Sequence, residues 1–257
     1  MTRGLGAMTG TAVAAAALAH AAPALAAVGP LRRAVLPGYA GRGDPGHLAL
    51  TFDDGPCRTS TPRFLELLAE REIRATFFVL GACLASDPGL GRDMVAGGHE
   101  LAVHGWHHRL LIRRTPAAAR EDLRRAHGLV GDLAGRPPCW YRPPYGVAST
   151  AALRTATGLG MRPVLWTAWG RDWTPRATPD SIRRAVLRVR PGGGTVLLHD
   201  ADTYSSPGSW WATLAALSSI LDVWQAHGMR VGPLSEHAAS RAGPAPRTVP
   251  GPGAVSE

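Results

Sequence analysis

Carboxylates and imidazoles follow several short apolar segments of this chain, an arrangement that suits hydrolysis at a metal ion. Asp53 and Asp54 come directly after the segment LALTF. Two adjacent buried carboxylates need a metal ion or an arginine to offset their charge. Because adjacent residues of an extended chain point in opposite directions, one carboxylate can bind a metal while the other acts as a base. A simple Asp-Gly turn after a strand is the structural alternative.

A pair of histidines follows a second apolar segment. His104 and His108 are four residues apart, so a helical turn would place them on one face, close enough to share one ion. Joined by an aspartate, they predict a site with two histidines and one carboxylate, which leaves coordination positions open for water and substrate. His107 would point elsewhere on such a turn, and we interpret it as a surface or supporting residue.

Three further apolar segments also end in polar residues. Arg142 precedes two prolines, and an arginine at a strand end can hold a carboxylate through a forked hydrogen bond. The prolines stiffen the loop, so the backbone N–H of Tyr145 is a candidate donor to an oxyanion. Asp172 lies beside a tryptophan and would need a polar partner if buried. His199 ends an apolar run, where a paired carboxylate would favour its charged, acidic form. Polar residues after any one apolar segment could have a structural role. Five apolar segments in succession that each end in polar residues are hard to attribute to chance.

The elements that must position these residues alternate between strands and helices. Such an alternation predicts a mainly parallel sheet or barrel, whose functional residues gather at the carboxyl ends of the strands. Threonine-proline pairs at 61–62, 115–116 and 178–179 place proline at the first position of three helices, and a fourth helix spans 210–226. The predicted strands are short and apolar or β-branched, and they span residues 47–52, 75–80, 100–104, 139–142, 162–168, 194–199 and 229–233.

The two ends of the chain differ in composition from its centre. Residues 1–27 combine Arg3, an alanine-rich stretch and an A-x-A pattern, which is the layout of a secretory signal peptide. The stretch is too short and too polar for a stable membrane span. We predict a secreted or cell-envelope protein, or a cytoplasmic one if this leader is not a signal peptide. Residues 28–44 are predicted as a linker, 45–234 as one catalytic domain and 235–257 as a disordered tail.

Charge and composition narrow the range of partners. The chain has 28 basic and 19 acidic residues, a net charge of +9, and its basic residues are all arginine apart from histidine. We interpret this as a compositional bias rather than a sign of phosphate binding, because the arginines are scattered and no basic run interleaves with aromatic residues. We therefore predict no nucleic-acid partner, and we expect a monomer.

Taken in order, the motifs resemble those of the polysaccharide deacetylases of carbohydrate esterase family 4. The TFDDGP hexamer is the most specific of them, and the resemblance extends over residues 45–234. It implies an α/β fold, namely a distorted (β/α) barrel of about seven strands of the deacetylase type. The five motifs are TFDDGP at 51–56, H-x-x-x-H at 104–108, RPPYG at 142–146, the segment around Asp172, and LLHD at 197–200.

The resemblance implies a metal centre with a base beside it. Asp54, His104 and His108 would bind a divalent transition metal, most plausibly Zn²⁺, with Co²⁺ as an alternative. Asp53 would be the general base, and Arg142 would orient it. The substrate would be an N-acetylated glycan such as a chitin-like oligomer or peptidoglycan.

The remaining motif residues would assist the leaving group and the acetyl group. His199 would be the general acid, with Asp172 as its charge partner. The backbone N–H of Tyr145 would help to hold the oxyanion. Leu197 and Trp173 would line the pocket for the acetyl methyl group.

The chain departs from the usual family pattern at two positions near these residues. Gly105 stands where serine or threonine is usual, which predicts weaker metal affinity unless His107 supports the loop instead. If the missing hydroxyl matters, Gly105→Ser should tighten metal binding. Trp169 stands where the fourth motif often has its first aspartate, whereas the second, Asp172, is present.

Four functions compete for this set of residues. The leading one is a metal-dependent hydrolase that removes N-acetyl groups from N-acetylglucosamine residues and releases acetate. An amide or imide hydrolase of the same fold, acting on a small non-sugar molecule, is the alternative that the altered motifs keep open. A glycan-binding module without catalysis is disfavoured because every proposed catalytic residue is present. A nucleic-acid binder has only the net charge in its favour.

Overall fold

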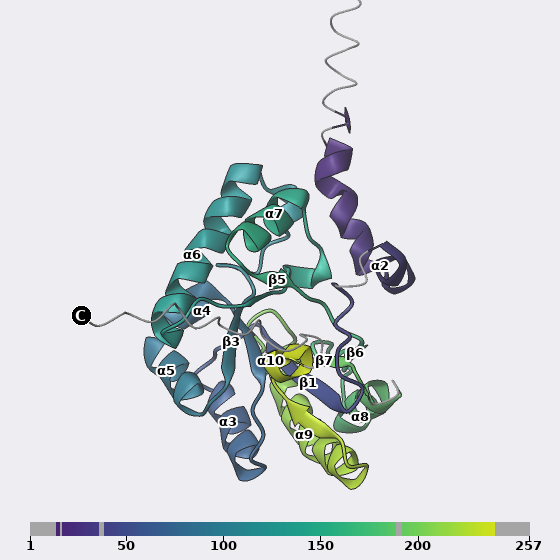
Figure 1. Ribbon diagram of the computed structural model, residues 1–257. Helices are drawn as coiled ribbons and strands as arrows, with labels where there is room; N and C mark the ends of the chain where they lie inside the picture. Colours follow the sequence, from purple (N-terminus) through teal and green to yellow (C-terminus); the bar gives the residue numbers. More distant parts are fainter. Residues whose placement is uncertain (1–13, 16, 36–38, 189–191, 240–257) are drawn as a thin grey trace, which may run out of the picture.

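The chain folds into a curved sheet of eight parallel strands surrounded by helices, as the computed structural model shows for residues 14–15, 17–35, 39–188 and 192–239 (Figure 1). The strands run in the order β5-β4-β3-β2-β1-β7-β6, and β8 pairs with β1. The prediction of a distorted (β/α) barrel is confirmed. The strands are β1 (His47–Asp53), β2 (Thr76–Val79), β3 (Glu100–Val103), β4 (Trp140–Tyr141), β5 (Arg162–Pro163), β6 (Ala168–Trp169), β7 (Thr195–His199) and β8 (Arg230–Gly232).

Strand β1 is the centre of the sheet. All seven of its residues are buried, as expected for a parallel strand covered on both faces. One edge pairs with β7 along most of its length, whereas the other edge is shared between two strands. β8 pairs with 47–49, and β2 pairs with 51–53. Because every pairing is parallel, the carboxyl ends of the strands meet at one edge, and β1 ends there with Asp53.

The four helices predicted from threonine-proline pairs and apolar runs are all present. They are α3 (Thr61–Glu70), α6 (Pro116–Ala134), α8 (Pro179–Leu187) and α9 (Ser209–Ala226). Thr115 caps α6 by accepting a hydrogen bond from the Ala118 backbone N–H, and Gly135 ends this helix with φ of +66°. The other α-helices of the barrel are α4 (Gly81–Ser86), α5 (Pro88–Ala96), α7 (Thr150–Gly158) and α10 (Leu234–Ala239).

The strand expected over 162–168 is divided into two. β5 pairs with β4 at one end of the sheet, and β6 pairs with β7 at the other. Pro163 has no backbone N–H for the ladder, and the Val164 backbone N–H still donates to the Tyr141 carbonyl of β4, but the N–H groups that follow turn elsewhere. That of Leu165 donates to the Tyr39 carbonyl, and that of Thr167 donates to the Thr195 carbonyl. The chain therefore crosses from one end of the sheet to the other within a few residues.

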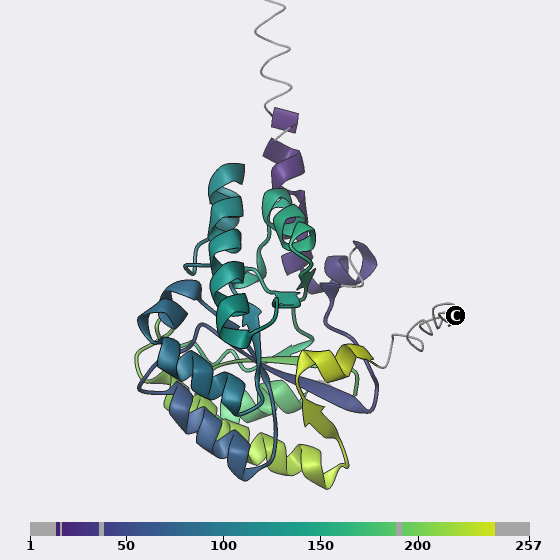
Figure 2. The ribbon, with the colours of Figure 1, turned by 60° about the vertical axis from the view of Figure 1, so that its left-hand side comes forward.

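The predicted linker over 28–44 contains structure. Helix α2 (Gly29–Val35) lies within it, and Tyr39 is buried against Leu165. The preceding segment includes η1 (Ala22–Ala27), and it lies beside α7 in both views (Figures 1 and 2). The hydroxyl of Thr150 in α7 donates a hydrogen bond to the carbonyl of Ala19. Residues 1–13, part of the predicted leader, lie outside the described residues.

The domain also extends slightly beyond its predicted carboxyl end. Helix α10 continues to Ala239, because Leu234 is buried and its backbone N–H donates to the Thr76 hydroxyl. The rest of the predicted tail, residues 240–257, lies outside the described residues. Among the helices of the described part, none combines the length and apolar character that a membrane crossing requires.

Candidate active site

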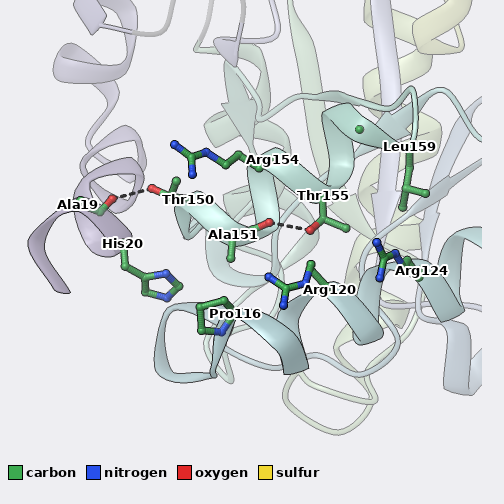
Figure 3. A pocket seen from close by; sticks show the side chains of 11 residues that line it. Ala19, His20, Pro116, Arg120, Arg124, Thr150, Ala151, Arg154, Thr155 and Leu159 are labelled. Atoms are coloured by element: carbon green, nitrogen blue, oxygen red, sulfur yellow. Dashed lines mark hydrogen bonds between the residues drawn. The ribbon is translucent and has the colours of Figure 1, made fainter. Parts of the chain in front are cut away.

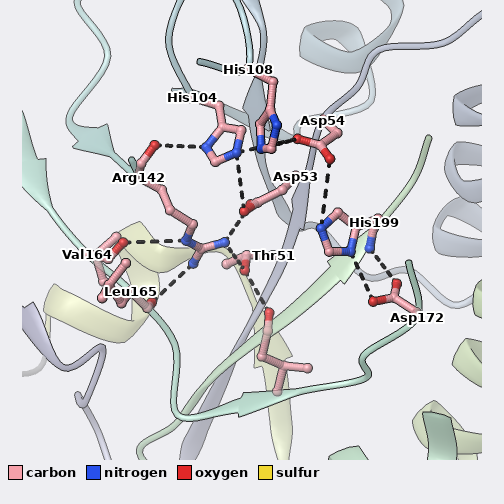
Figure 4. Close-up of polar contacts among 11 residues, drawn as sticks. Thr51, Asp53, Asp54, His104, His108, Arg142, Val164, Leu165, Asp172 and His199 are labelled. Carbon is pink, nitrogen blue, oxygen red and sulfur yellow. Dashed lines mark hydrogen bonds and ion pairs between the residues drawn. The ribbon is translucent and has the colours of Figure 1, made fainter. Parts of the chain in front are cut away.

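Three side chains converge at the carboxyl ends of β1 and β3 (Figure 4). Asp54 follows β1, and His104 and His108 follow β3 (Glu100–Val103). Their donor atoms all lie within 4.8 Å of one another. Asp54 Oδ1 is 3.4 Å from Nε2 of His104 and 3.4 Å from Nε2 of His108. The backbone of Asp54 takes the left-handed conformation, with φ of +76°, which turns the chain sharply after the strand.

The chemistry of these three groups fits a divalent transition metal. Asp54 Oδ1 is buried and has no hydrogen-bond partner in the described part of the chain. His104 donates from Nδ1 to the Arg142 carbonyl at 2.8 Å, which leaves the lone pair of Nε2 directed at Asp54. An aspartate oxygen and two imidazole nitrogens are ordinary ligands of Zn²⁺.

The protonation states of the site also suit metal binding. Burial opposes ionisation of Asp54, but the imidazoles of His104 and His199 outweigh it and lower its pKa to about 2. Burial, together with the nearby His104, lowers the pKa of His108 to about 4. The carboxylate is therefore ionised and the His108 imidazole neutral near pH 7, as a metal ligand requires.

A second carboxylate, Asp53, is held by a buried arginine. Arg142 Nη1 donates to Asp53 Oδ1 at 2.6 Å and to the Thr51 hydroxyl at 2.8 Å. Its other nitrogens donate to the carbonyls of Val164 and Leu165. Because Arg142 is fully buried, these bonds fix the guanidinium, and the guanidinium fixes Asp53. The second oxygen of Asp53 faces His104 at 3.8 Å, toward the metal-ligand group.

An imidazole with its own carboxylate lies on the other side of Asp54. His199, the last residue of β7, donates from Nδ1 to Asp172 Oδ1 at 3.0 Å. Asp172 Oδ2 accepts from the His199 backbone N–H and from the Thr213 hydroxyl. Burial disfavours the charged imidazole, but Asp172 and Asp54 outweigh it and raise the pKa of His199 to about 10. His199 Nε2 is 3.9 Å from Asp54 Oδ2 and can present a proton to the same pocket.

The loop after β4 carries Tyr145 in a left-handed conformation, with φ of +60°. A non-glycine residue in this region is strained, and strained residues concentrate at functional sites. The Tyr145 ring is 59% exposed and lies 4.3 Å from the His108 ring, measured between centroids. The ring of Tyr145 thus lies next to the metal-ligand group, and the residue lines the same pocket.

A pocket of about 210 Å³ unites most of the predicted site residues. Asp172 and Arg142 do not line it, and they act on it through His199 and Asp53. The predicted residues that do line it are Asp53, Asp54, His104, His108, Tyr145, Trp173, Leu197 and His199.

Aromatic residues form the walls of this pocket, where the predicted site residue Trp173 is joined by Trp166, Trp169 and Tyr204, which were not among the predicted site residues. Trp166, Trp169 and Trp173 follow one another with centroid distances of 5.5 and 5.0 Å, and Trp173 lies 5.6 Å from His199. Across the pocket, the Tyr204 ring lies 4.7 Å from His108 and is 45% exposed. The chain has eight tryptophans but only four phenylalanines and four tyrosines, a balance that does not locate such walls, and nothing in the sequence distinguished Tyr204.

Asp200 is a further buried acid beside the site. It accepts a hydrogen bond from the Thr61 hydroxyl, and its other oxygen is buried without a partner in the described chain. Burial raises its pKa to about 7. A side chain on Gly55 would collide with this carboxyl group, so the glycine allows the turn after Asp54 to pack against it.

The loop between the two histidines is supported differently from the expectation. Asp122 of α6 accepts a hydrogen bond from the Trp106 backbone N–H at 2.8 Å, so the support comes from this carboxylate rather than from His107. Gly105 has φ of +109°, and a Cβ there would lie 3.0 Å from Asp122 Oδ1. Serine at this position would be strained and would crowd the supporting carboxylate, so the structure gives no reason to expect tighter metal binding from Gly105→Ser.

Comparison with known proteins identifies the family. The sequence model described as Polysaccharide deacetylase matches residues 40–164. The chain is 38% identical over 200 residues to a chitooligosaccharide deacetylase from Sinorhizobium fredii, covering 73% of this chain and 90% of that protein. The chain belongs to the polysaccharide deacetylase family. The prediction of a hydrolase of this class is therefore confirmed.

Two further similarities agree with this assignment. A peptidoglycan-N-acetylglucosamine deacetylase, PgdA of Listeria monocytogenes, is 33% identical over 153 residues. The match covers 60% of this chain and 32% of PgdA, so it concerns about a third of that longer protein. The solved structure of the Bc1960 peptidoglycan N-acetylglucosamine deacetylase superposes with a TM-score of 0.72 at 28% identity. That superposition covers 79% of this chain and 94% of the other, which supports the barrel fold.

Proposed function

We propose that this protein is a metal-dependent N-deacetylase that releases acetate from N-acetylglucosamine residues of a chitin-like oligomer or peptidoglycan. One observation carries the proposal. The metal-ligand group of Asp54, His104 and His108 lies in one pocket between a carboxylate held by Arg142 and an imidazole held by Asp172. The pocket thus offers a base and an acid on two sides of a cation site. The substrate class is taken from the relatives, which are a chitooligosaccharide deacetylase and a peptidoglycan-N-acetylglucosamine deacetylase.

Asp53 and His199 have complementary roles in this reaction. A Zn²⁺ or Co²⁺ ion held by Asp54, His104 and His108 would supply Lewis acidity toward the acetyl carbonyl and make water a stronger acid. Asp53 accepts a proton as the water oxygen attacks the acetyl carbon. The carbon–nitrogen bond then breaks, and His199 gives its Nε2 proton to the leaving nitrogen. The products are acetate and a free amine on the sugar.

Two residues behind the pocket keep these groups in the required states. Arg142 holds Asp53 in place through Oδ1, which leaves Oδ2 free to take a proton. Asp172 favours the protonated form of His199, which an acid needs before the amine leaves.

The walls of the pocket would bind the sugar and its acetyl group. The Tyr145 backbone N–H would donate to the oxyanion, and Leu197 and Trp173 would offer apolar surface for the methyl group; all three residues line the pocket. The exposed rings of Tyr145 and Tyr204 flank His108 and offer faces on which a pyranose ring can stack. The predicted secretory leader would bring the enzyme to an extracellular polymer.

Acetate release tests the proposal. Zinc-loaded protein would be incubated with acetylated chitooligosaccharides and with peptidoglycan, and acetate would be quantified enzymatically. We expect release from at least one of the two polymers, and the ratio of the rates ranks them. Absence of release from protein with metal bound would contradict the proposal. It would favour a small-molecule amide or imide hydrolase, which a narrow pocket walled by three indole rings could also serve.

A further inference from the structure

A second hollow, of about 560 Å³, lies on the outside of the barrel between the amino-terminal segment, α6 and α7 (Figure 3). Three arginines line it, namely Arg120 and Arg124 from α6 and Arg154 from α7. None of the residues that line it also lines the candidate active site. The hollow is therefore a separate feature with a strongly basic lining.

No carboxylate within the described part of the chain pairs with these arginines. Across the described residues, the guanidinium groups of Arg120, Arg124 and Arg154 have no ion pair and no hydrogen-bond acceptor. Arg120 and Arg124 are also one helical turn apart, an arrangement in which like charges repel. The compositional excess of arginine accounts for the number of arginines in the chain. It does not account for three of them lining one hollow whose lining holds neither aspartate nor glutamate among the described residues.

Arginines elsewhere on the surface fall into two groups. Five form ion pairs with nearby carboxylates, with nitrogen to oxygen distances from 2.5 to 3.4 Å. Others, such as Arg92, Arg114 and Arg184, have no ion pair within the described residues, and none of these three lines the hollow. The pairs are Arg58–Asp87, Arg63–Glu66, Arg71–Asp222, Arg74–Glu236 and Arg230–Asp44.

The amino-terminal wall adds an unpartnered polar atom. His20 lines the hollow, and its Nε2 atom is buried without a hydrogen-bond partner in the described chain. The bond from the Thr150 hydroxyl to the Ala19 carbonyl fixes this wall against α7. All three guanidinium groups come from α6 and α7, so the basic lining does not depend on residues 1–27 being retained.

We propose that this hollow binds a phosphate ester. Guanidinium groups present planar forks of N–H donors that match phosphate oxygens, and they bind phosphate more specifically than a point charge does. Three such groups can balance the charge of up to two units on a phosphomonoester. The volume of the hollow, about 560 Å³, exceeds that of a bare phosphate ion, so it has room for the organic substituent of an ester.

Calorimetry on the full chain, freed of metal by chelation, tests this inference. The probe is glycerol 3-phosphate at constant ionic strength, with glycerol in chloride of the same ionic strength as the blank. We expect saturable binding to one site, and at least a tenfold rise in the dissociation constant for Arg154→Gln and for Arg124→Gln. Arg184→Gln on α8 is the matched control, because it removes an exposed helical arginine outside the hollow, and it should leave the constant unchanged.

Three outcomes would overturn the inference. They are absence of saturable binding, equal weakening in the Arg184 control, and binding that neither hollow variant affects. Arg154→Gln should not change acetate release from a soluble chitooligosaccharide, so a failure here is distinct from a failure of the proposed catalysis.

The same variants identify the source of the phosphate. Co-sedimentation with vesicles of phosphatidylglycerol and phosphatidylcholine, weakened by Arg154→Gln, would assign the ligand to a lipid headgroup. Binding of glycerol 3-phosphate without co-sedimentation would assign it to a soluble ester.

Discussion

The two ends of β1 each carry a buried group of histidines and a carboxylate, yet they differ in what they can do. At the amino end, His47 Nδ1 lies 3.1 Å from His237 Nδ1, so one ring donates to the other. His47 Nε2 lies 3.6 Å from Glu236. At the carboxyl end, Asp54 faces the Nε2 atoms of two histidines. Only the carboxyl-end group has three donor atoms close enough to hold a metal ion, among the residues the structure describes.

The state of the carboxylate explains this difference. Glu236 is partly exposed and pairs with Arg74 at 2.6 Å, so an exposed arginine already offsets the charge of its carboxylate. Asp54 is almost wholly buried, and its Oδ1 has no hydrogen-bond partner in the described chain. The imidazoles at the amino end contact each other through their Nδ1 atoms, whereas both of their Nε2 atoms are buried without a hydrogen-bond partner in the described chain. Similar residue types therefore stabilise the barrel at one end and predict chemistry at the other, as in other barrels with parallel strands.

The substitution with the largest expected effect is Asp53→Asn at the carboxyl end. It keeps the shape of the side chain but removes the base, so acetate release should fall by at least about 100-fold. Metal content, measured by elemental analysis, should be unchanged because Asp53 is not among the three ligands. Comparable activity in this variant would show that Asp53 is not the base.

His104→Ala should abolish metal binding and, with it, acetate release. Loss of a direct ligand should weaken affinity by more than the roughly 10–100-fold that supporting residues typically account for. A metal-indicator competition assay measures this. Full occupancy in the variant would contradict the ligand group of Asp54, His104 and His108.

Asp172→Asn should change the pH dependence of acetate release. Asp172 raises the pKa of His199, so removing its charge should lower that pKa. An acid is active below its pKa, and the alkaline fall in activity should therefore begin at a lower pH in the variant. A pH–rate profile with the same alkaline limb as the parent protein would exclude Asp172 as the charge partner.

Tyr204→Ala should have a smaller effect, mainly on KM. The ring offers a stacking face beside His108 but supplies no proton and no ligand. KM for a chitooligosaccharide should rise several-fold with little change in kcat. Tyr204→Phe is the control, because it keeps the ring, and it should behave like the parent protein.

His237→Gln, at the amino end of β1, should leave catalysis unchanged and lower stability. Loss of the bond to His47 should reduce the unfolding free energy by about 1 kcal/mol at pH 7, measured by urea denaturation. Burial and the neighbouring His47 lower the pKa of His237 to about 4, so the unfolded chain binds protons more readily. Stability from this group is present above about pH 6.5 and is lost as pH falls toward 4. A large loss of activity in folded His237→Gln would break the contrast between the two ends.

The sequence predicted which polar residues meet at the carboxyl end of β1, because most of them follow an apolar strand. Asp54, His104 and His199 are recognisable as titratable groups at strand ends, where a parallel sheet brings them together. The division of the strand over 162–168 was not predictable. It depends on the Leu165 backbone N–H donating to the Tyr39 carbonyl, a contact between segments far apart in the sequence.

Other features were missed because their patterns resemble ordinary surfaces or cores. His47 reads as part of an apolar strand, and its partner His237 lies beyond the predicted end of the domain. In the sequence, Arg120 and Arg154 have the pattern of solvent-exposed residues on two separate helices. Only the packing of α6 on α7 brings them to the same hollow. The sequence interpretation of Gly105 considered only the hydroxyl group that glycine lacks. In the structure, its backbone conformation and the neighbouring Asp122 limit which side chains this position can hold.

The most direct test of the account is a zinc titration of chelated protein, with acetate release from an acetylated chitooligosaccharide measured at each addition. The account predicts no release without metal, a rise to a plateau at one equivalent of zinc, and the same curve for His237→Gln. Release from the fully chelated protein, or none after one zinc ion has bound, would contradict the claim that the carboxyl end of β1 is a metal-dependent deacetylase centre.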